Sequence, residues 1–157
     1  MDKANTKPAA GKPQDKLYVI DATGLLVGRL ATQAARAALH GRMVRVVNSE
    51  QAVISGSKRF LVAEWTRRFR QGVPRKGPYI HRYPDRMLRR IIRGMLPHHQ
   101  PRGRVAFANT MCYIGVPTEL KGVKPVAIEG AKASKLPSNR YLTMTQLCKE
   151  IGGRWHE

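Results

Sequence analysis

The sequence has few cysteines and no long apolar run. Of its 157 residues only Cys112 and Cys148 are cysteines, and they form no C-x-x-C motif. Two such thiols supply neither a zinc site nor a disulfide framework, so we expect a reducing, cytoplasmic setting. No stretch approaches the roughly 18 apolar residues that a spanning helix needs, which disfavours a membrane partner.

Acidic residues are also scarce, because 10 Asp and Glu stand against 29 Lys and Arg, for a formal net charge of +19. A charge of this size destabilises a compact chain by self-repulsion, so it indicates a polyanionic partner. Nucleic acid is the first candidate and an anionic membrane surface the second. Apolar residues make up 42% of the chain, which is enough for a core, and the length suits one domain.

The positive charge is concentrated in one part of the chain. Residues 58–104 contain 14 Lys and Arg and only two acids, Glu64 and Asp85, for a local charge of +12. The other 110 residues contain 15 basic and 8 acidic residues, for +7. A merely solvated surface usually intersperses both signs, so this basic tract indicates a surface that binds a polyanion.

Two regions are distinguished along the chain. Residues 1–16 are polar and basic with no apolar signal core, so we expect a flexible arm and no secretion. A solvated tail without a task is an equally good interpretation of this arm. Residues 17–157 are expected to form a single domain, with a C-terminal extension from about residue 118 that begins in a stretch rich in Gly, Pro and Lys.

Short apolar segments alternate with helical ones, which predicts an α/β fold. Strands are expected at 17–20, 44–47, 52–54 and 111–114, and helices at about 25–40, 57–70, 84–95, 103–109 and 144–151. The strand–helix–strand order implies a parallel pair, and nearly unbroken apolar strands suit a small sheet covered on both faces. For the last helix, Thr143 and Gln146 form a capping box, and Gly152 marks the stop.

The most informative stretch is 82–93, which covers most of the helix expected at about 84–95 and is taken as helical throughout. Five arginines recur on one face of it without an acid partner, opposite an apolar stripe. An ordinary amphipathic helix would mix Glu with Lys there, and arginine makes planar, bidentate contacts to phosphate. We therefore interpret this face as binding RNA or DNA. The arginines are Arg82, Arg86, Arg89, Arg90 and Arg93, and the apolar stripe is Met87, Leu88, Ile91, Ile92 and Met95.

Cations and aromatic residues alternate around this helix. Cations pair with phosphates, and Tyr and His can stack on unpaired bases, as in RNA recognition. Tyr79 and Tyr83 could equally pack on the adjoining helix. A favourable helix dipole explains one or two of the cations that end the preceding helix, but not all three. The basic residues are Arg67, Arg68 and Arg70 before the loop, Arg75, Lys76 and His81 in it, and His98, His99, Arg102 and Arg104 after it.

Catalytic patterns are weak. Gly24 and Gly28 follow a strand, but the G-x-G-x-x-G fingerprint is missing, and close helix–sheet packing explains these glycines better. Residues 55–58 could cradle a phosphate at a helix start, but N-capping is the better interpretation. The adjacent His98 and His99 do not set two metal ligands on one helical face. We expect no enzyme activity, no metal, no cofactor and no small-molecule substrate.

Four segments resemble a known family in their order and spacing. They are YVIDATGLLVGRLA at 18–31, VVNSEQAVISGSK at 46–58, GPYIHRYPDRMLRRIIRGMLPH at 77–98 and RGRVAFANTMCYIGVP at 102–117. Together they are similar to the universal large-subunit ribosomal protein thirteen family in its archaeal and eukaryotic form. The tail at 122–157 resembles archaeal members, whereas the arm at 1–16 lies outside the match.

The resemblance implies a three-layer α/β/α fold with a small, mostly parallel, Rossmann-like sheet and basic helical and loop extensions. It also implies a structural constituent of the large ribosomal subunit, in contact with ribosomal RNA and neighbouring ribosomal proteins. One alternative is a nucleotide-using enzyme on the same fold, but the sequence lacks the phosphate-binding glycine motif that such an enzyme needs. Another is a regulatory RNA-binding module, which needs a discrete recognition surface, whereas the charge here spans several elements. The RNA-binding residues that we expect are Lys58, Arg67, Arg68, Arg70, Arg75, Lys76, Tyr79, His81, Arg82, Arg86, Arg89, Arg90, Arg93, His98, Arg102 and Arg104.

Overall fold

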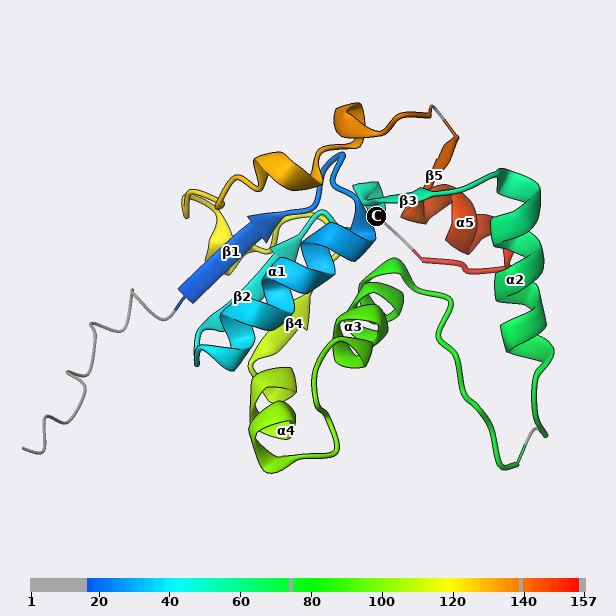
Figure 1. The fold of residues 1–157 in the computed structure, drawn as a ribbon, viewed down its shortest axis with the longest axis horizontal. Coiled ribbons are helices and arrows are strands. Elements are labelled where there is room, and N and C mark those ends of the chain that lie inside the picture. The colour runs from blue at the N-terminus through cyan, green and yellow to red at the C-terminus, as the bar shows by residue number, and fades with distance from the viewer. Residues whose placement is uncertain (1–16, 74, 139, 156–157) are drawn as a thin grey trace, which may run out of the picture.

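The computed structural model describes residues 17–73, 75–138 and 140–155, and the arm predicted at 1–16 lies outside them (Figure 1). The strands and helices expected from the apolar pattern are present, with a strand–helix–strand unit first and three consecutive helices in the middle. The elements are β1 Leu17–Asp21, α1 Val27–Leu39, β2 Met43–Val47, β3 Val53–Ser55, α2 Lys58–Arg70, α3 Pro84–Gly94, α4 Pro101–Ala108, β4 Thr110–Cys112, β5 Tyr141–Thr143 and α5 Met144–Glu150. No helix in the described part is long and apolar enough to cross a membrane.

The central sheet is small and parallel, in the order β1-β2-β4. On one face Ile20, Val44 and Val46 belong to the main core together with α1. On the other face Val19 and Val47 pack with Leu120 of a short 3-10 turn. The predicted three-layer α/β fold is confirmed. The segment after β4 forms the layer that covers the second face of the sheet.

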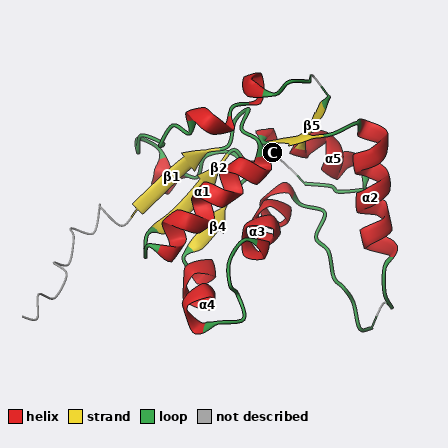
Figure 2. Cartoon of the chain, in the orientation of Figure 1, coloured by secondary structure: helices red, strands yellow, loops and turns green. Residues whose placement is uncertain are grey.

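A second sheet lies apart from the first. β3 and β5 pair antiparallel, with Ile54 opposite Leu142. Figure 2 shows this pair near α2 and α5, away from the parallel strands. The strand expected at 52–54 is thus present, but its partner, β5, was not predicted, because the partner is separated from it by most of the domain.

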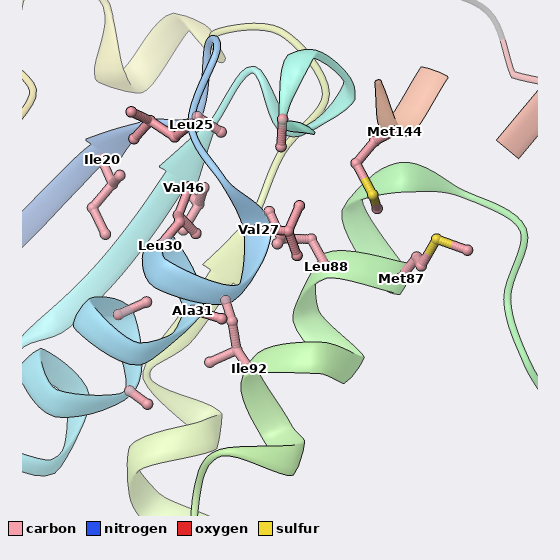
Figure 3. Close-up of a cluster of buried hydrophobic side chains, with 14 of the residues drawn as sticks. Ile20, Leu25, Val27, Leu30, Ala31, Val46, Met87, Leu88, Ile92 and Met144 are labelled. Carbon is pink, nitrogen blue, oxygen red and sulfur yellow. The ribbon is translucent and has the colours of Figure 1, made fainter. Parts of the chain in front are cut away.

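The main core lies between α1, the sheet and α3. The alanine-rich face of α1 lets these elements approach closely, with Leu30, Ala31 and Ala34 fully buried. Figure 3 shows Leu88 and Ile92 of α3 directed toward this face. The predicted apolar stripe of α3 is wrong at one position, because Met95 is 42% exposed. The helix ends at Gly94, and Met95 follows it as the C-cap residue.

Helix ends follow the predicted chemistry. The hydroxyl of Thr143 accepts a hydrogen bond from the Gln146 backbone N–H, while the Gln146 side chain accepts one from Thr143 N–H, both at 3.2 Å. Ser57 caps α2 by accepting a hydrogen bond from Phe60 N–H, which confirms the predicted N-capping. Gly152 has a φ of 81°, as expected after a helix end.

The packing explanation of Gly24 and Gly28 is wrong. A Cβ atom added to either glycine would meet nothing within 4 Å. Gly24 instead has a φ of 63°, a left-handed conformation that favours glycine in a turn. Neither position requires glycine for helix–sheet contact.

Candidate nucleic-acid interface

The predicted RNA-binding residues lie mainly on the end of α2, the loop after it, α3 and the start of α4 (Figure 1). Nearly all of them are exposed, and only Arg89 and His98 are half-buried. The structure brings most of these side chains onto connected elements. Lys58 lies apart from the rest, and Arg82 packs against Phe69 and the C-terminal segment.

Arg82 is not part of the helical arginine face. Pro84 occupies the first turn of α3 and Tyr83 is its N-cap residue, so Arg82 lies two residues before the helix. Its guanidinium lies 5.0 Å from the centre of the Phe69 ring. A Cβ atom at Gly152 would also lie 3.2 Å from Arg82 Nη1, which places this side chain against the C-terminal segment.

Four arginines of α3 remain on one face and line a surface cavity of about 640 Å³. They stand at i, i+3, i+4 and i+7, which is one continuous helical face. His81 from the loop and Phe107 from α4 complete the lining, and no acidic residue of the described chain contributes to it. The four arginines are Arg86, Arg89, Arg90 and Arg93.

Three of these arginines are held in place by neighbouring groups. Arg89 lies over the Phe107 ring at 4.6 Å, and Arg86 lies over the Tyr83 ring at 5.6 Å. Arg90 donates a hydrogen bond of 2.8 Å from Nη1 to the carbonyl oxygen of Tyr79. These contacts orient the guanidinium groups without neutralising them, because rings and carbonyls carry no net charge.

The arginines at the end of α2 do have an acid partner. Glu64 accepts hydrogen bonds of 2.9–3.0 Å from Arg67 and one of 2.9 Å from Arg68. The hydrogen bond from Arg67, assisted by that from Arg68, overcomes partial desolvation and lowers the pKa of Glu64 to about 2. Arg67 and Arg68 also line a cavity of about 380 Å³ together with Arg90, which connects the end of α2 with α3.

Lys58 stands apart from the arginine surface. It begins α2, about 18 Å along the helix from Arg70. Its ammonium group forms an ion pair with Glu150 of α5. This contact ties α2 to α5, so the structure gives Lys58 an intramolecular partner.

The two tyrosines of the loop region are exposed. Tyr79 is 63% exposed and Tyr83 is 41% exposed, so neither ring is buried on the adjoining helix. The Tyr79 hydroxyl donates a hydrogen bond of 2.6 Å to the carbonyl oxygen of Arg75, which orders the loop. Lys76 is exposed in the same loop.

The segment at the start of α4 continues the basic surface. Arg102 donates from Nε to Gln100 Oε1 at 3.0 Å, and Arg104 donates to the carbonyl oxygen of His99 at 3.4 Å. The rings of His98 and His99 have centres 4.0 Å apart. Within the described chain, no group of three or more His, Cys, Asp or Glu side chains is arranged to hold a metal ion.

One residue of the cavity was missed by sequence reasoning. Phe107 was not selected, although it follows Arg104 by three residues within the same short helix. The only local signal was an aromatic residue beside a basic tract. Its place under Arg89 depends on how α4 packs against α3, which no local pattern specifies.

The two cysteines do not add reactive groups. Burial raises the pKa of Cys112 and of Cys148 to about 12. Both thiols are therefore protonated near neutral pH, and a protonated thiol is a poor nucleophile. The charge of Asp85 makes a smaller contribution to both pKa increases, whereas Arg89 opposes the pKa increase of Cys112.

Comparison with known proteins identifies the family. The family model described as ribosomal protein L13 matches residues 15–119. A large ribosomal subunit protein uL13 from Methanococcoides burtonii is 42% identical over 139 residues, which cover 88% of this chain and all of the relative. Proteins of the same description from Methanosarcina barkeri and Methanopyrus kandleri are 41% and 39% identical, covering 88% and 97% of this chain and 100% and 95% of the relatives.

These matches cover the segment that carries the parallel sheet and the arginine surface, and these three relatives are archaeal. The chain belongs to the ribosomal protein L13 family and is of its archaeal type.

Proposed function

We propose that the chain is a structural constituent of the large ribosomal subunit in the cytoplasm, and that its arginine-rich surface binds and positions ribosomal RNA. Its partners are then ribosomal RNA and neighbouring ribosomal proteins, and its task is to support subunit assembly and translation. Membership of a ribosomal protein family supports the structural role, and it makes the protein a component rather than an enzyme.

The observation that carries the RNA-binding part is the lining of the α3 cavity. Four arginines and a histidine face one space, and no described acid lines it. Like charges this close repel each other, so the arrangement is unfavourable until an anion enters. Phosphate suits the site because guanidinium groups bind it in a bidentate manner.

The exposed rings of Tyr79 and Tyr83 support RNA with unpaired bases as the partner, rather than a duplex bound only through its phosphates. Unpaired bases stack on aromatic side chains, whereas duplex DNA offers its bases only through the grooves. The basic surface extends from the end of α2 through the loop to α4, so a branched or folded RNA fits it better than one straight helix.

Sedimentation of gently lysed cells tests the structural role. We expect the protein in the large-subunit fraction at low salt, with release only at high salt, because counterion release weakens phosphate contacts. A protein found mainly free at low salt would contradict the role.

Salt titration tests the arginine surface. The double variant Arg86→Gln and Arg93→Gln should reduce the slope of log K against log salt by about 1.4 to 1.8 for binding to large-subunit RNA. The matched control removes two charges elsewhere, by Lys121→Gln and Lys124→Gln, both exposed and remote from α3 in the sequence. Equal losses in both variants would show that net charge, and not the arginine surface, determines binding.

A further inference from the structure

The cavity beside α3 has features that simple phosphate binding does not require. These arginines line an open surface cavity of about 640 Å³, which contacts to phosphates alone do not need. That volume falls in the range of about 300–1,000 Å³ that is usual for pockets holding small organic ligands. The ligand should therefore have a body that enters the cavity, as well as a charge.

Arg89 and Phe107 make one wall of the cavity suitable for a flat ring. The guanidinium of Arg89 lies 4.6 Å from the centre of the Phe107 ring, and both side chains are half-buried. RNA-binding proteins stack unpaired bases on aromatic rings and on guanidinium planes. This pair supplies one of each on adjacent helices, α4 and α3.

One polar atom of the same wall lacks an acceptor. The Nε atom of Arg89 is buried, and no described residue accepts a hydrogen bond from it. Buried donors of charged groups are costly when they have no partner. A ligand in the cavity reaches this donor only if the Arg89 side chain moves, because the atom has no surface exposed to the cavity.

The charged groups at the rim are placed for a phosphate. Arg86 and Arg93 are exposed at either end of the arginine face, and His81 lies on the loop side. A nucleotide has its phosphate and its base at opposite ends, so one ligand can meet both the rim and the wall.

We propose that this cavity binds a single unpaired nucleotide, with its base against Arg89 and Phe107 and its phosphate between the rim arginines. The inference rests on the proposed RNA-binding function and specifies the form of RNA that α3 receives. It predicts that the RNA partner presents an extruded or bulged nucleotide here and not continuous duplex.

Binding of AMP and of ribose 5-phosphate to the full chain tests this inference. The two probes share the sugar phosphate, and only AMP has a base. We expect AMP to bind at least about fivefold more tightly, the lower end of what stacking of one base contributes. In NMR spectra AMP should shift the Phe107 ring protons and the Arg89 Nε–H resonance, whereas ribose 5-phosphate should leave the ring protons unchanged.

Variants separate the wall from the rim. Phe107→Leu should reduce the preference for AMP to less than about twofold and leave ribose 5-phosphate binding unchanged, because a leucine cannot stack on a base. Phe60→Leu is the matched control, because Phe60 is 65% exposed on α2 and does not line the cavity. Arg86→Gln should weaken both probes to the same extent.

The wild-type comparison alone can overturn the inference. Equal affinity for the two probes, no binding of either, or shifts that map outside the cavity would each contradict a nucleotide site. The proposed function would still stand without the nucleotide site if the wild type binds large-subunit RNA and the Arg86→Gln and Arg93→Gln double variant shows the reduced salt dependence. If RNA binding does not depend on that surface, both fail.

Discussion

Asn48 donates a hydrogen bond of 2.9 Å from Nδ2 to Oδ1 of Asp21, and this contact joins the carboxyl ends of β2 and β1. The same oxygen accepts hydrogen bonds from the backbone N–H and the hydroxyl of Thr23, at 3.0 and 2.7 Å. Asn48 has a φ of 53°, a conformation that asparagine tolerates better than most residues. In other α/β folds this edge of the sheet binds ligands, but here the carboxylate orders the chain's own turns.

Asp21 should make stability depend on pH in the acid range. Burial opposes its ionisation, but the hydrogen bonds from Thr23 and Asn48 outweigh burial and lower its pKa below 3.8. A lowered folded-state pKa stabilises the fold above the unfolded-state pKa, and this contribution is lost as pH falls through the folded-state value. Asp21→Asn should therefore cost about 1 to 3 kcal/mol at pH 7, and less at pH 3 and below, in urea unfolding.

The control for Asp21→Asn is Glu119→Gln, which removes one exposed acid from a 3-10 turn. It should leave the free energy of unfolding within about 0.5 kcal/mol of the parent. A constant loss for Asp21→Asn between pH 7 and pH 2 would show that the charge of Asp21 is not involved.

Gly103 should not tolerate a side chain. A Cβ atom there would lie 2.0 Å from the carbonyl oxygen of Pro97, so α4 would have to move. Gly103→Ala should cost about 1 to 3 kcal/mol or more in thermal or urea unfolding, as overpacked sites do. Gly28→Ala is the opposite case, since its Cβ would meet nothing and alanine favours the helix, so stability should rise by up to about 1 kcal/mol. Equal effects of the two variants would contradict the packing of α4 on Pro97.

Glu64 should limit RNA binding by the end of α2. It holds Arg67 and Arg68 in ion pairs, and its pKa of about 2 keeps it ionised under physiological conditions. Glu64→Gln should release both arginines, and should tighten binding to large-subunit RNA and steepen its salt dependence. Glu119→Gln changes the net charge equally and serves as the control. No difference between the two variants would place Arg67 and Arg68 outside the RNA contact.

The capping box should stabilise the C-terminal helix. Thr143→Ala removes the hydroxyl that accepts from Gln146 N–H at 3.2 Å. Loss of such a cap typically costs about 1 kcal/mol, which thermal unfolding followed by circular dichroism can measure. Ser134→Ala alters an exposed hydroxyl in a 3-10 turn and should change the midpoint little. A midpoint of Thr143→Ala equal to that of the parent would mean that the cap contributes nothing.

Local patterns account for most of the elements. Apolar periodicity predicted each α-helix, the parallel strands and β3, and the capping residues predicted where α2 and α5 begin. These features depend on neighbours within about four residues, so a single sequence contains the information. The identity of β5 depended instead on pairing with β3, and sequence spacing does not encode such distant pairing.

The same division holds for the candidate site. Composition revealed an excess of basic residues over 58–104, and helical spacing placed Arg86, Arg89, Arg90 and Arg93 on one face, because both properties are local. Spacing alone also placed Arg82 on this face, because spacing does not take into account that α3 begins two residues later, at Pro84.

The contacts of the basic side chains with other elements depend on tertiary packing. It set Phe107 beneath Arg89, paired Lys58 with Glu150, and formed the cavity between α3 and α4. Each of these contacts joins residues from different elements, and their meeting depends on how the whole core packs. The amino-acid composition alone therefore determines the net charge of the chain. The arrangement of the arginines around the cavity is determined by the fold, because it depends on contacts between distant elements.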